Sequence, residues 1–339
     1  MDGILVVEGH ITDYESLIGL SRSRLLSNRE WTTDYVFGAR VYVEREDGTL
    51  FPAVPPDPNV HLPRDPRYVI SKGKLDTNSR YRLRIGIGNY QYFSEFSYPI
   101  ITPEIDSIFW RKRDRIDQWN FPQPIISIHV ATHSPDRQVM FYRWSFREDW
   151  EINAPLPHPT FPSRCWDFHN SSELLFGSAE RTIEGRVIHQ IRELSRRDSR
   201  FSGLLYRITV TQNAISRDAH RYFENLRRNI EQTGSIFSPT PAILRGNIYN
   251  ATDPNRHVVG FIDVSTTTRS RLYISRWDGA YIGDSMSCVP RIRTAIPEWE
   301  WNAFPHFEYV PGGFVRLTCV SCRALGDNLT TEKPNDWPF

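Results

Sequence analysis

The sequence predicts a mainly β protein, with an N-terminal β-sandwich of the immunoglobulin or transthyretin type and a larger β-rich lobe that contains one amphipathic helix. Three observations lead to this class. Aromatic residues make up 13% of the chain, which suits pleated, half-buried surfaces. The 339 residues include 19 glycines and 24 prolines, too many for a mostly helical protein. Short alternating segments recur between turn signals, as in β-sandwiches.

The first lobe, predicted over residues 1–102, contains segments rich in β-branched and aromatic residues. They are Ile4–Glu8, Leu17–Ser23, Ala39–Glu44, Tyr81–Ile87 and Gln91–Tyr98. Val41 and Val43 alternate with polar residues, as half-buried strands require. Asp-Gly within Glu46–Thr49 supplies the positive φ of a hairpin turn. The stretch Pro52–Pro66 is predicted to be a proline-rich loop.

Prolines at Pro99–Pro103 mark a boundary, after which residues 103–339 form the second lobe. Its predicted strands are Ser107–Lys112, Ile125–His129, Met140–Arg147, Leu204–Thr211, His257–Val264 and Arg271–Ser275. A helix is predicted over 217–233, because apolar residues recur at helical spacing after the N-cap candidate Ser216. These apolar residues are Ala219, Tyr222, Phe223, Leu226 and Ile230. The proline-rich segment Asn153–Pro162 is predicted to be an exposed or draped loop.

Charge and hydropathy restrict the classes of partner. With 41 basic and 40 acidic residues the formal charge is +1, so no overall field attracts nucleic acid or anionic lipid. No apolar run reaches the roughly 20 residues of a membrane span, and no signal peptide is visible. We therefore expect either a cytoplasmic protein or one whose targeting segment has been removed. All but four of the basic residues are arginines, which reflects either a GC-rich genome or a surface where arginines stack on aromatic rings.

The four cysteines, Cys165, Cys288, Cys319 and Cys322, allow three fully paired connectivities. Cys319 and Cys322 form a Cys-x-x-Cys pair, which occurs in redox dithiols, in zinc sites and as the ends of two separate disulfides. No second such pair or nearby His pair completes a zinc site, and no long helix follows as in redox proteins. We therefore expect structural disulfides, with Cys288 joined to Cys319 or Cys322.

No nucleophile-elbow, zinc-protease or P-loop motif is present, so we expect no catalytic residue, metal or cofactor. His129 and His133 would share a strand face, but without a nearby carboxylate an ordinary polar face is expected. In Glu298–Trp301, two carboxylates alternate with two indoles. Adjacent carboxylates on one strand rarely flank a sugar bond. Trp299 and Trp301 are instead candidates for stacking on a ligand or packing against a partner.

Several further segments carry a family pattern in their order and spacing. They are Val7–Asp13, Leu20–Ser23, Val36–Val41, Tyr81–Ile85, Tyr92–Glu95, Pro103–Ile108, Tyr206–Gln212, Gly234–Phe237, Gly246–Ile248 and Cys319–Arg323, with Pro334 and Trp337 near the end. With these segments the chain resembles, over essentially its whole length, the Bacteroidota outer-membrane lipoproteins catalogued as domain-of-unknown-function family 4249.

The resemblance implies a non-enzymatic lipoprotein on the external cell surface, whose signal peptide and anchor cysteine are not in this sequence. Members are often encoded beside TonB-dependent outer-membrane transporters, so the implied role is an accessory subunit of such a (SusC-like) transporter, with a glycan or peptide as a further ligand. The two proline-rich loops, Pro52–Pro66 and Asn153–Pro162, are the candidate contacts.

Two other classes of function remain open at this stage: a secreted glycan-active hydrolase and a structural component of an envelope assembly. A close, opposed carboxylate pair in an aromatic cleft would favour the hydrolase. A flat aromatic patch rimmed by arginines would favour a binding partner.

Overall fold

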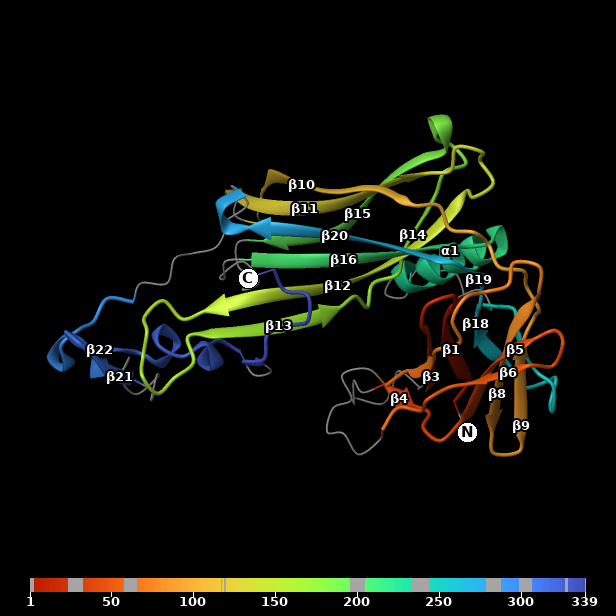
Figure 1. The fold of residues 1–339 in the computed structure, drawn as a ribbon, viewed down its shortest axis with the longest axis horizontal. Coiled ribbons are helices and arrows are strands. Elements are labelled where there is room, and N and C mark those ends of the chain that lie inside the picture. Colours follow the sequence, from red (N-terminus) through yellow and green to blue (C-terminus); the bar gives the residue numbers. More distant parts are fainter. Residues whose placement is uncertain are drawn as a thin grey trace.

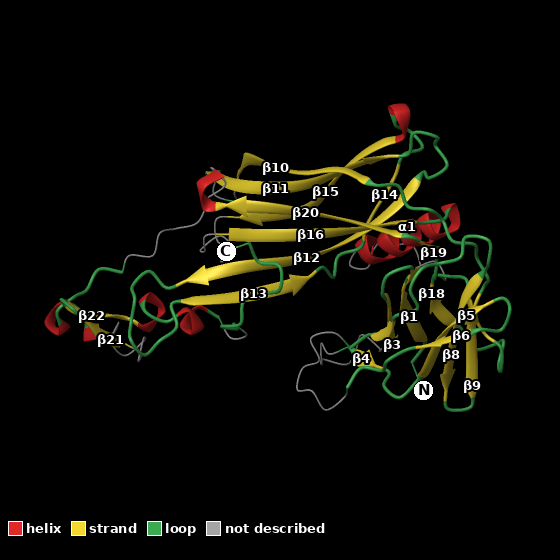
Figure 2. Cartoon of the chain, in the orientation of Figure 1, coloured by secondary structure: helices red, strands yellow, loops and turns green. Residues whose placement is uncertain are grey.

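The computed structural model describes residues 3–23, 33–57, 66–116, 118, 120–195, 205–232, 244–278, 288–298, 307–326 and 329–338. These residues form two β-rich lobes and a projecting arm (Figure 1). Strands dominate both lobes, and the helix α1 lies where the lobes meet (Figure 2). The prediction of a mainly β fold is confirmed.

The N-terminal lobe is a sandwich of two sheets. Its strands are β1 (Leu5–Gly9), β2 (Ile11–Thr12), β3 (Ser16–Arg22), β4 (Asp34–Tyr35), β5 (Arg40–Arg45), β6 (Leu50–Pro52), β7 (Tyr68–Ile70), β8 (Tyr81–Ile87), β9 (Tyr90–Ser94), β17 (Ile248–Asn250), β18 (Val258–Gly260) and β19 (Val264–Ser265). One sheet runs β18–β1–β3–β4, with β7 paired to β3, and the other runs β17–β9–β8–β5–β6. Alternate residues of both sheets, including Val7, Leu20, Val43 and Leu83, fill the core between them. Gly48, at φ +89°, makes the predicted β5–β6 turn.

The predicted division at residue 102 needs a correction, because the sandwich takes strands from much later in the chain. Strands β18 and β19 run parallel to β1 and β2, and β17 pairs with β9. Gly260 permits the close approach to β1, since a Cβ there would lie 2.3 Å from the carbonyl oxygen of Val7. The N-terminal lobe therefore consists of the first hundred residues and a returning segment, 246–265.

The larger lobe is a second sandwich built from longer strands. Its elements are β10 (Ile105–Ile116), β11 (Pro122–His133), β12 (Phe141–Asn153), β13 (Arg164–Asn170), β14 (Leu175–Ser178), η1 (Ile183–Gly185), β15 (Arg186–Ser195), β16 (Leu205–Ala214), α1 (Arg217–Gln232), β20 (Thr267–Ser275) and η3 (Arg276–Asp278). One sheet runs β10–β11–β15 and the other β13–β12–β16–β20, with β14 paired to β12. Side chains of both sheets, including Ile128, Trp144 and Ile208, form its core. The strand predicted at His257–Val264 is wrong as a single element, because β18 and β19 divide it between two sheets.

The predicted helix is confirmed as α1. The Ser216 hydroxyl accepts a hydrogen bond from the amide of Ala219 at 3.1 Å, which makes Ser216 the N-cap. The buried side of the helix consists of Ala219, Tyr222 and Phe223, which pack on Phe141 and Phe176 of the larger lobe, with Val259 and Phe261 of the returning segment nearby. Ile230, predicted to share this stripe, is 63% exposed. The helix therefore packs against both lobes.

An arm projects from the larger lobe at the end opposite α1 (Figure 1, left). It consists of residues 154–163, between β12 and β13, and the described part of 288–326. Its elements are η4 (Arg293–Ala295), β21 (Phe307–Val310), β22 (Gly313–Arg316), η5 (Leu317–Cys319) and η6 (Cys322–Leu325). Disulfides join Cys288 to Cys319 within the arm, and Cys165 of β13 to Cys322. The expected disulfides are confirmed, and Cys319 is the partner of Cys288.

Hydrogen bonds join the two lobes. Next to them, within the N-terminal lobe, the His10 ring Nε2 lies 2.8 Å from the Ser265 hydroxyl of the returning segment. The Asp263 carboxylate accepts hydrogen bonds from the amide and hydroxyl of Ser216, at 2.7 and 3.1 Å. Arg143 of β12 donates to the carbonyl of Gly9. The returning segment thus supplies polar groups to the junction between the lobes.

Candidate functional site

The outer face of the sheet β17–β9–β8–β5–β6 carries arginines and aromatic residues at successive positions. Because side chains alternate along a strand, the residues between the buried Val41, Val43, Leu83 and Ile85 point outward. The outward side chains are Arg40, Tyr42, Arg82, Arg84, Phe93 and Tyr249, followed by Phe96 beyond β9. We call this surface the arginine–aromatic face.

Stacking organises the centre of this face. Phe93 lies opposite Arg84 on one side and Tyr249 on the other, and the Phe93 and Tyr249 ring centroids are 6.1 Å apart. The Arg82 guanidinium lies 4.2 Å from the Phe93 centroid and 4.4 Å from that of Phe96. Cation–π contacts of this kind hold arginine and ring in fixed orientations.

Carboxylates neutralise the arginines at one end of the face. Arg82 pairs with Glu44 at 3.0 Å, between side chains that are mostly buried. Arg80 donates to Glu46 at 2.7 Å. The hydrogen bonds from Arg80 lower the pKa of the Glu46 carboxyl below its usual value.

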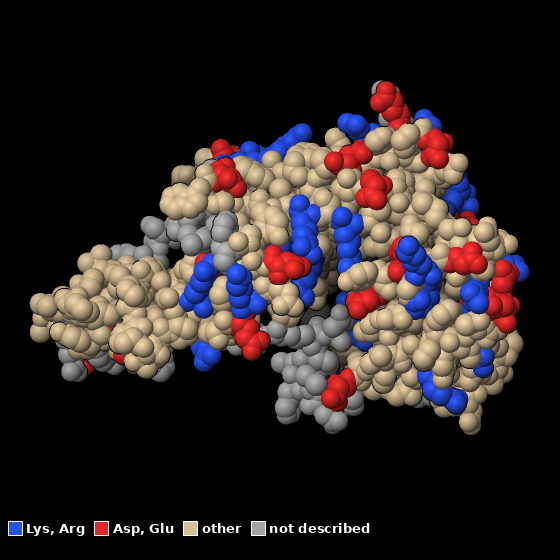
Figure 3. All heavy atoms as spheres, in the orientation of Figure 1, with Lys and Arg blue, Asp and Glu red and all other residues tan. Residues whose placement is uncertain are grey.

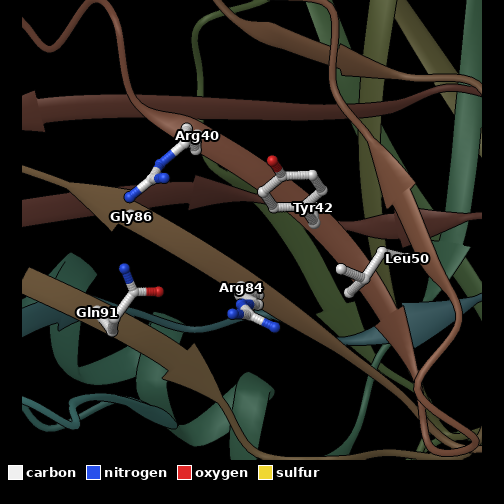
Figure 4. Close-up of a pocket in the computed structure, with 6 residues that line it drawn as sticks. All are labelled: Arg40, Tyr42, Leu50, Arg84, Gly86 and Gln91. Carbon is white, nitrogen blue, oxygen red and sulfur yellow. The ribbon is translucent and has the colours of Figure 1, made fainter.

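The other end of the face contains a shallow hollow of about 140 Å³, lined by Arg40, Tyr42, Leu50, Arg84, Gly86 and Gln91 (Figure 4). Gly86 is its floor: a Cβ there would lie 3.1 Å from Gln91 Nε2 and 3.5 Å from Arg40 Nε. Within the described part of the chain, neither Arg40 nor Arg84 has a carboxylate at ion-pair distance. Both charges are therefore available to a ligand.

A second polar cluster lies inside the larger lobe, around Glu148 of β12. Glu148 has 0% exposure and shares its side of the strand with the aromatic core. Its carboxylate accepts hydrogen bonds from the Tyr206 hydroxyl at 2.5 Å and Arg192 Nε at 3.1 Å, and it contacts His169 Nδ1 at 3.1 Å. Because protein groups already occupy it and no side is open to solvent, this carboxylate stabilises the sandwich and offers nothing to a substrate.

Comparison with known protein families matches residues 1–271 to a domain of unknown function, DUF4249. This chain belongs to the DUF4249 family. The family resemblance is thereby confirmed for the segments within residues 1–271, whereas Cys319–Arg323, Pro334 and Trp337 lie beyond the match. The matched region includes the whole arginine–aromatic face, whereas residues 288–326 of the arm lie beyond it. No curated protein matches this DUF4249 chain.

The predicted site residues of this DUF4249 protein lie in different surroundings, and two of them lie outside the described residues. Trp299 and Trp301 lie outside the described residues, and the neighbouring Glu298 is exposed. His129 stacks on Phe109 with centroids 5.3 Å apart, whereas His133 pairs with Asp106 at 2.7 Å. The two histidines therefore have separate partners, which agrees with a polar strand face. Within the described ranges, no three His, Cys, Asp or Glu side chains gather as metal ligands would.

The two proline-rich loops have different surroundings in the DUF4249 structure. The backbone of the second loop is fastened, because the Leu156 amide donates to the Cys319 carbonyl and the Cys322 amide to the Pro162 carbonyl, both at 2.9 Å. Leu156 and Phe161 pack on the small apolar core of the arm. The first loop is described only in part, since residues 58–65 lie outside the described ranges. A contact role for either loop stays a prediction.

The arginine–aromatic face is a candidate functional surface that was not predicted from the sequence. Its signal lies in the residues that alternate with the predicted core positions, since Arg40 and Tyr42 flank Val41 and point the opposite way. None of the described helices of this DUF4249 protein has the length and apolar composition needed to cross a bilayer.

Proposed function

We propose that this DUF4249 protein is a non-enzymatic accessory lipoprotein on the external face of the outer membrane of a Bacteroidota cell, where it docks onto a TonB-dependent transporter. The observation that carries the proposal is the arginine–aromatic face. It is a sheet surface on which guanidinium groups stack on partly exposed rings. Arg and Tyr are the residue types enriched in the energetically dominant parts of protein interfaces.

The disulfides support a location outside the cytoplasm. Both pairs are formed, and Cys165 and Cys322 are fully buried. Structural disulfides persist in oxidising compartments such as the periplasm and the cell surface. The arm that they fasten is mostly uncharged on the face seen in Figure 3.

The hydrolase alternative receives no support from the described residues. A glycosidase needs two carboxyl groups facing each other across an open cleft. The buried carboxylate Glu148 is bridged through Arg192 to the half-exposed Glu173. An ion-paired cluster of this kind in a core is a stabilising arrangement and leaves no room for a sugar.

The test is affinity purification of the tagged native protein from detergent-solubilised outer membranes, combined with protease treatment of intact cells. We expect a TonB-dependent transporter to co-purify and the added protease to remove the protein from intact cells. Recovery of the protein alone, together with full protection from protease, would contradict both the partner and the location.

Two variants test the docking face. Replacing Phe93 and Tyr249 together with alanine removes the stacked pair and is expected to reduce the recovered transporter at least about tenfold. The control is Tyr309→Ala, which removes an exposed aromatic ring from the arm. Loss of the transporter with Tyr309→Ala alone would move the docking surface to the arm.

A further inference from the structure

We propose that the hollow between Arg40 and Arg84 receives a carboxylate side chain, Asp or Glu, of the protein partner. This inference rests on the proposed docking function and assigns the chemical group that this part of the face recognises. Four observations carry it: the placement of the two arginines, their missing counter-ions, the floor at Gly86, and the size of the hollow.

The strand register places the two guanidinium groups on one side of the same sheet. Arg40 lies opposite Gly86, and Tyr42 lies opposite Arg84, so Arg40 and Arg84 are diagonal neighbours. Diagonal neighbours on one face of an antiparallel pair are about 7–8 Å apart at their backbones. Two long arginines at this spacing can each donate to one carboxylate held between them.

The two arginines differ from their neighbours in charge balance. Arg82, two residues before Arg84, is paired with Glu44. Within the described ranges, Arg40 and Arg84 have no such counter-ion, and the contact found for Arg84 is with the Phe93 ring at 5.7 Å. The face therefore has two positive charges at one end that a negatively charged partner group would complement.

The missing side chain at position 86 lets Arg40 and Gln91 line the hollow close to the strand, since a Cβ there would lie 3.1 Å from Gln91 Nε2 and 3.5 Å from Arg40 Nε. Arg40 and Gln91 extend toward each other above Gly86, and Tyr42 stands beside them (Figure 4). Gly86 lies within a regular strand of the sheet, so a turn does not explain the glycine. The close approach of the Arg40 and Gln91 side chains to this backbone accounts for a glycine in the strand interior.

The size of the hollow limits how much of a ligand can enter it. Sites for whole small molecules usually enclose about 300–1,000 Å³, whereas this hollow measures about 140 Å³. It can hold one functional group but not a sugar ring. Aromatic rings next to the hollow, Tyr42 and Phe93, suit the packing of a protein surface around an inserted side chain. The inserted group is therefore a single carboxylate, and the docking face around the hollow makes an acidic side chain of the protein partner its source in this proposal.

The probe is a short blocked peptide, acetyl-Gly-Glu-Gly-amide, titrated into the isotope-labelled full chain while the arginine Nε–H signals are followed by NMR. We expect saturable shifts of the Arg40 and Arg84 signals. The matching peptide with Gln in place of Glu should leave them unchanged, because it lacks the charge. Glucuronate is added in a parallel titration and should bind more weakly than the Glu peptide.

Two variants test separately whether binding of the peptide depends on the charge and on the shape of the hollow. Arg84→Gln is expected to weaken binding of the Glu peptide about tenfold, the loss of one charge-assisted hydrogen bond. Gly86→Ala keeps both charges but raises the floor, and is expected to weaken binding by a similar factor with an unchanged unfolding midpoint. Arg113→Gln, an exposed arginine of the larger lobe, is the control and should change nothing.

Equal shifts with the Gln peptide, parallel shifts of Arg113, or tighter binding of glucuronate would each overturn the carboxylate proposal. These outcomes leave the purification of the transporter untouched. Conversely, peptide binding at Arg40 and Arg84 in a protein that is recovered without a transporter would retain the carboxylate site and remove the proposed docking function.

Discussion

His10 is buried at the junction of the lobes. Its ring Nε2 lies 2.8 Å from the Ser265 hydroxyl, and the same hydroxyl lies 3.0 Å from the Thr266 carbonyl. Burial, together with the positive charge of Arg143, lowers the pKa of His10 to about 3. The folded protein thus keeps this imidazole neutral.

Acid is expected to destabilise the protein through His10. Below pH 6.5, the ordinary pKa, the unfolded chain takes up a proton that the folded His10 does not. The free energy of unfolding therefore falls by about 2–3 kcal/mol from pH 7 to pH 4.5 on account of this residue. His10→Gln should lose less stability over this range in urea unfolding, whereas the exposed His257→Gln should follow the wild type. Identical losses in His10→Gln and wild type would contradict the buried neutral state.

Asp263, in the same junction, is expected to act in the opposite direction. Burial raises the pKa of its carboxyl to about 6, although the hydrogen bonds from Ser216 oppose the rise. Between the ordinary value of 3.8 and about 6, the folded state binds the extra proton, so lowering the pH stabilises it. From pH 7 to pH 4.5 the gain is about 2 kcal/mol.

Asp263→Asn should remove this gain while keeping an oxygen that accepts from Ser216. Its unfolding free energy should therefore fall more steeply with acid than that of the wild type, the reverse of His10→Gln. Urea unfolding at pH 7 and pH 4.5 measures both. A variant that tracks the wild type at both pH values would show that Asp263 is ionised throughout.

At the scale of elements, the two disulfides are expected to stabilise different units. Cys165 and Cys322 belong to the core of the larger lobe, whereas Cys319 packs in the small core of the arm with Cys288. Replacing Cys165 and Cys322 by serine should lower the global unfolding free energy by roughly 2–5 kcal/mol. Replacing Cys288 and Cys319 should leave the global transition nearly unchanged and open the arm to limited proteolysis. Equal global losses in both variants would show that the arm unfolds together with the lobe.

Strands in which apolar and polar residues alternate could be predicted from the sequence. Strands with charged residues on the core side could not. Val41 and Val43 identify β5, because only apolar residues face inward there. The prediction for β12 stopped at Arg147, but the strand continues through Glu148 to Asn153. Glu148 finds its donors on β13, β15 and β16, which approach it only in the folded lobe.

The same reason limits what could be predicted of the candidate site. The hollow depends on the lateral register that sets Arg40 beside Gly86 and Gln91 on three strands. Alternation indicates which residues point outward but not which neighbour each one meets. The disulfide partner of Cys288 was open for a similar reason, since Cys319 and Cys322 are close in sequence and enter different cores.

At the scale of the whole molecule, the N-terminal sandwich is expected to need its returning segment. Without residues 244–266, the edges of β1 and β9 lose their partners and the core loses Ile248, Ile262 and Val264. A fragment of residues 1–102 should therefore show no cooperative unfolding by circular dichroism. Joining residues 244–266 to it through a flexible linker should restore a cooperative transition, and Gly260→Val in that linked chain should remove it. A folded 1–102 fragment would contradict this dependence.

The returning segment also fixes the order in which the protein can mature. The chain emerges from the ribosome starting from its N-terminus, yet the first sandwich closes only with β19 at residue 265. At roughly 5–20 residues per second, synthesis delivers that strand roughly 10–30 s after residue 102 has appeared. Throughout this interval the edges of β1 and β2 are unpaired and open to strands of other molecules. The N-terminal lobe is therefore most prone to edge-to-edge association before residue 265 has been synthesised.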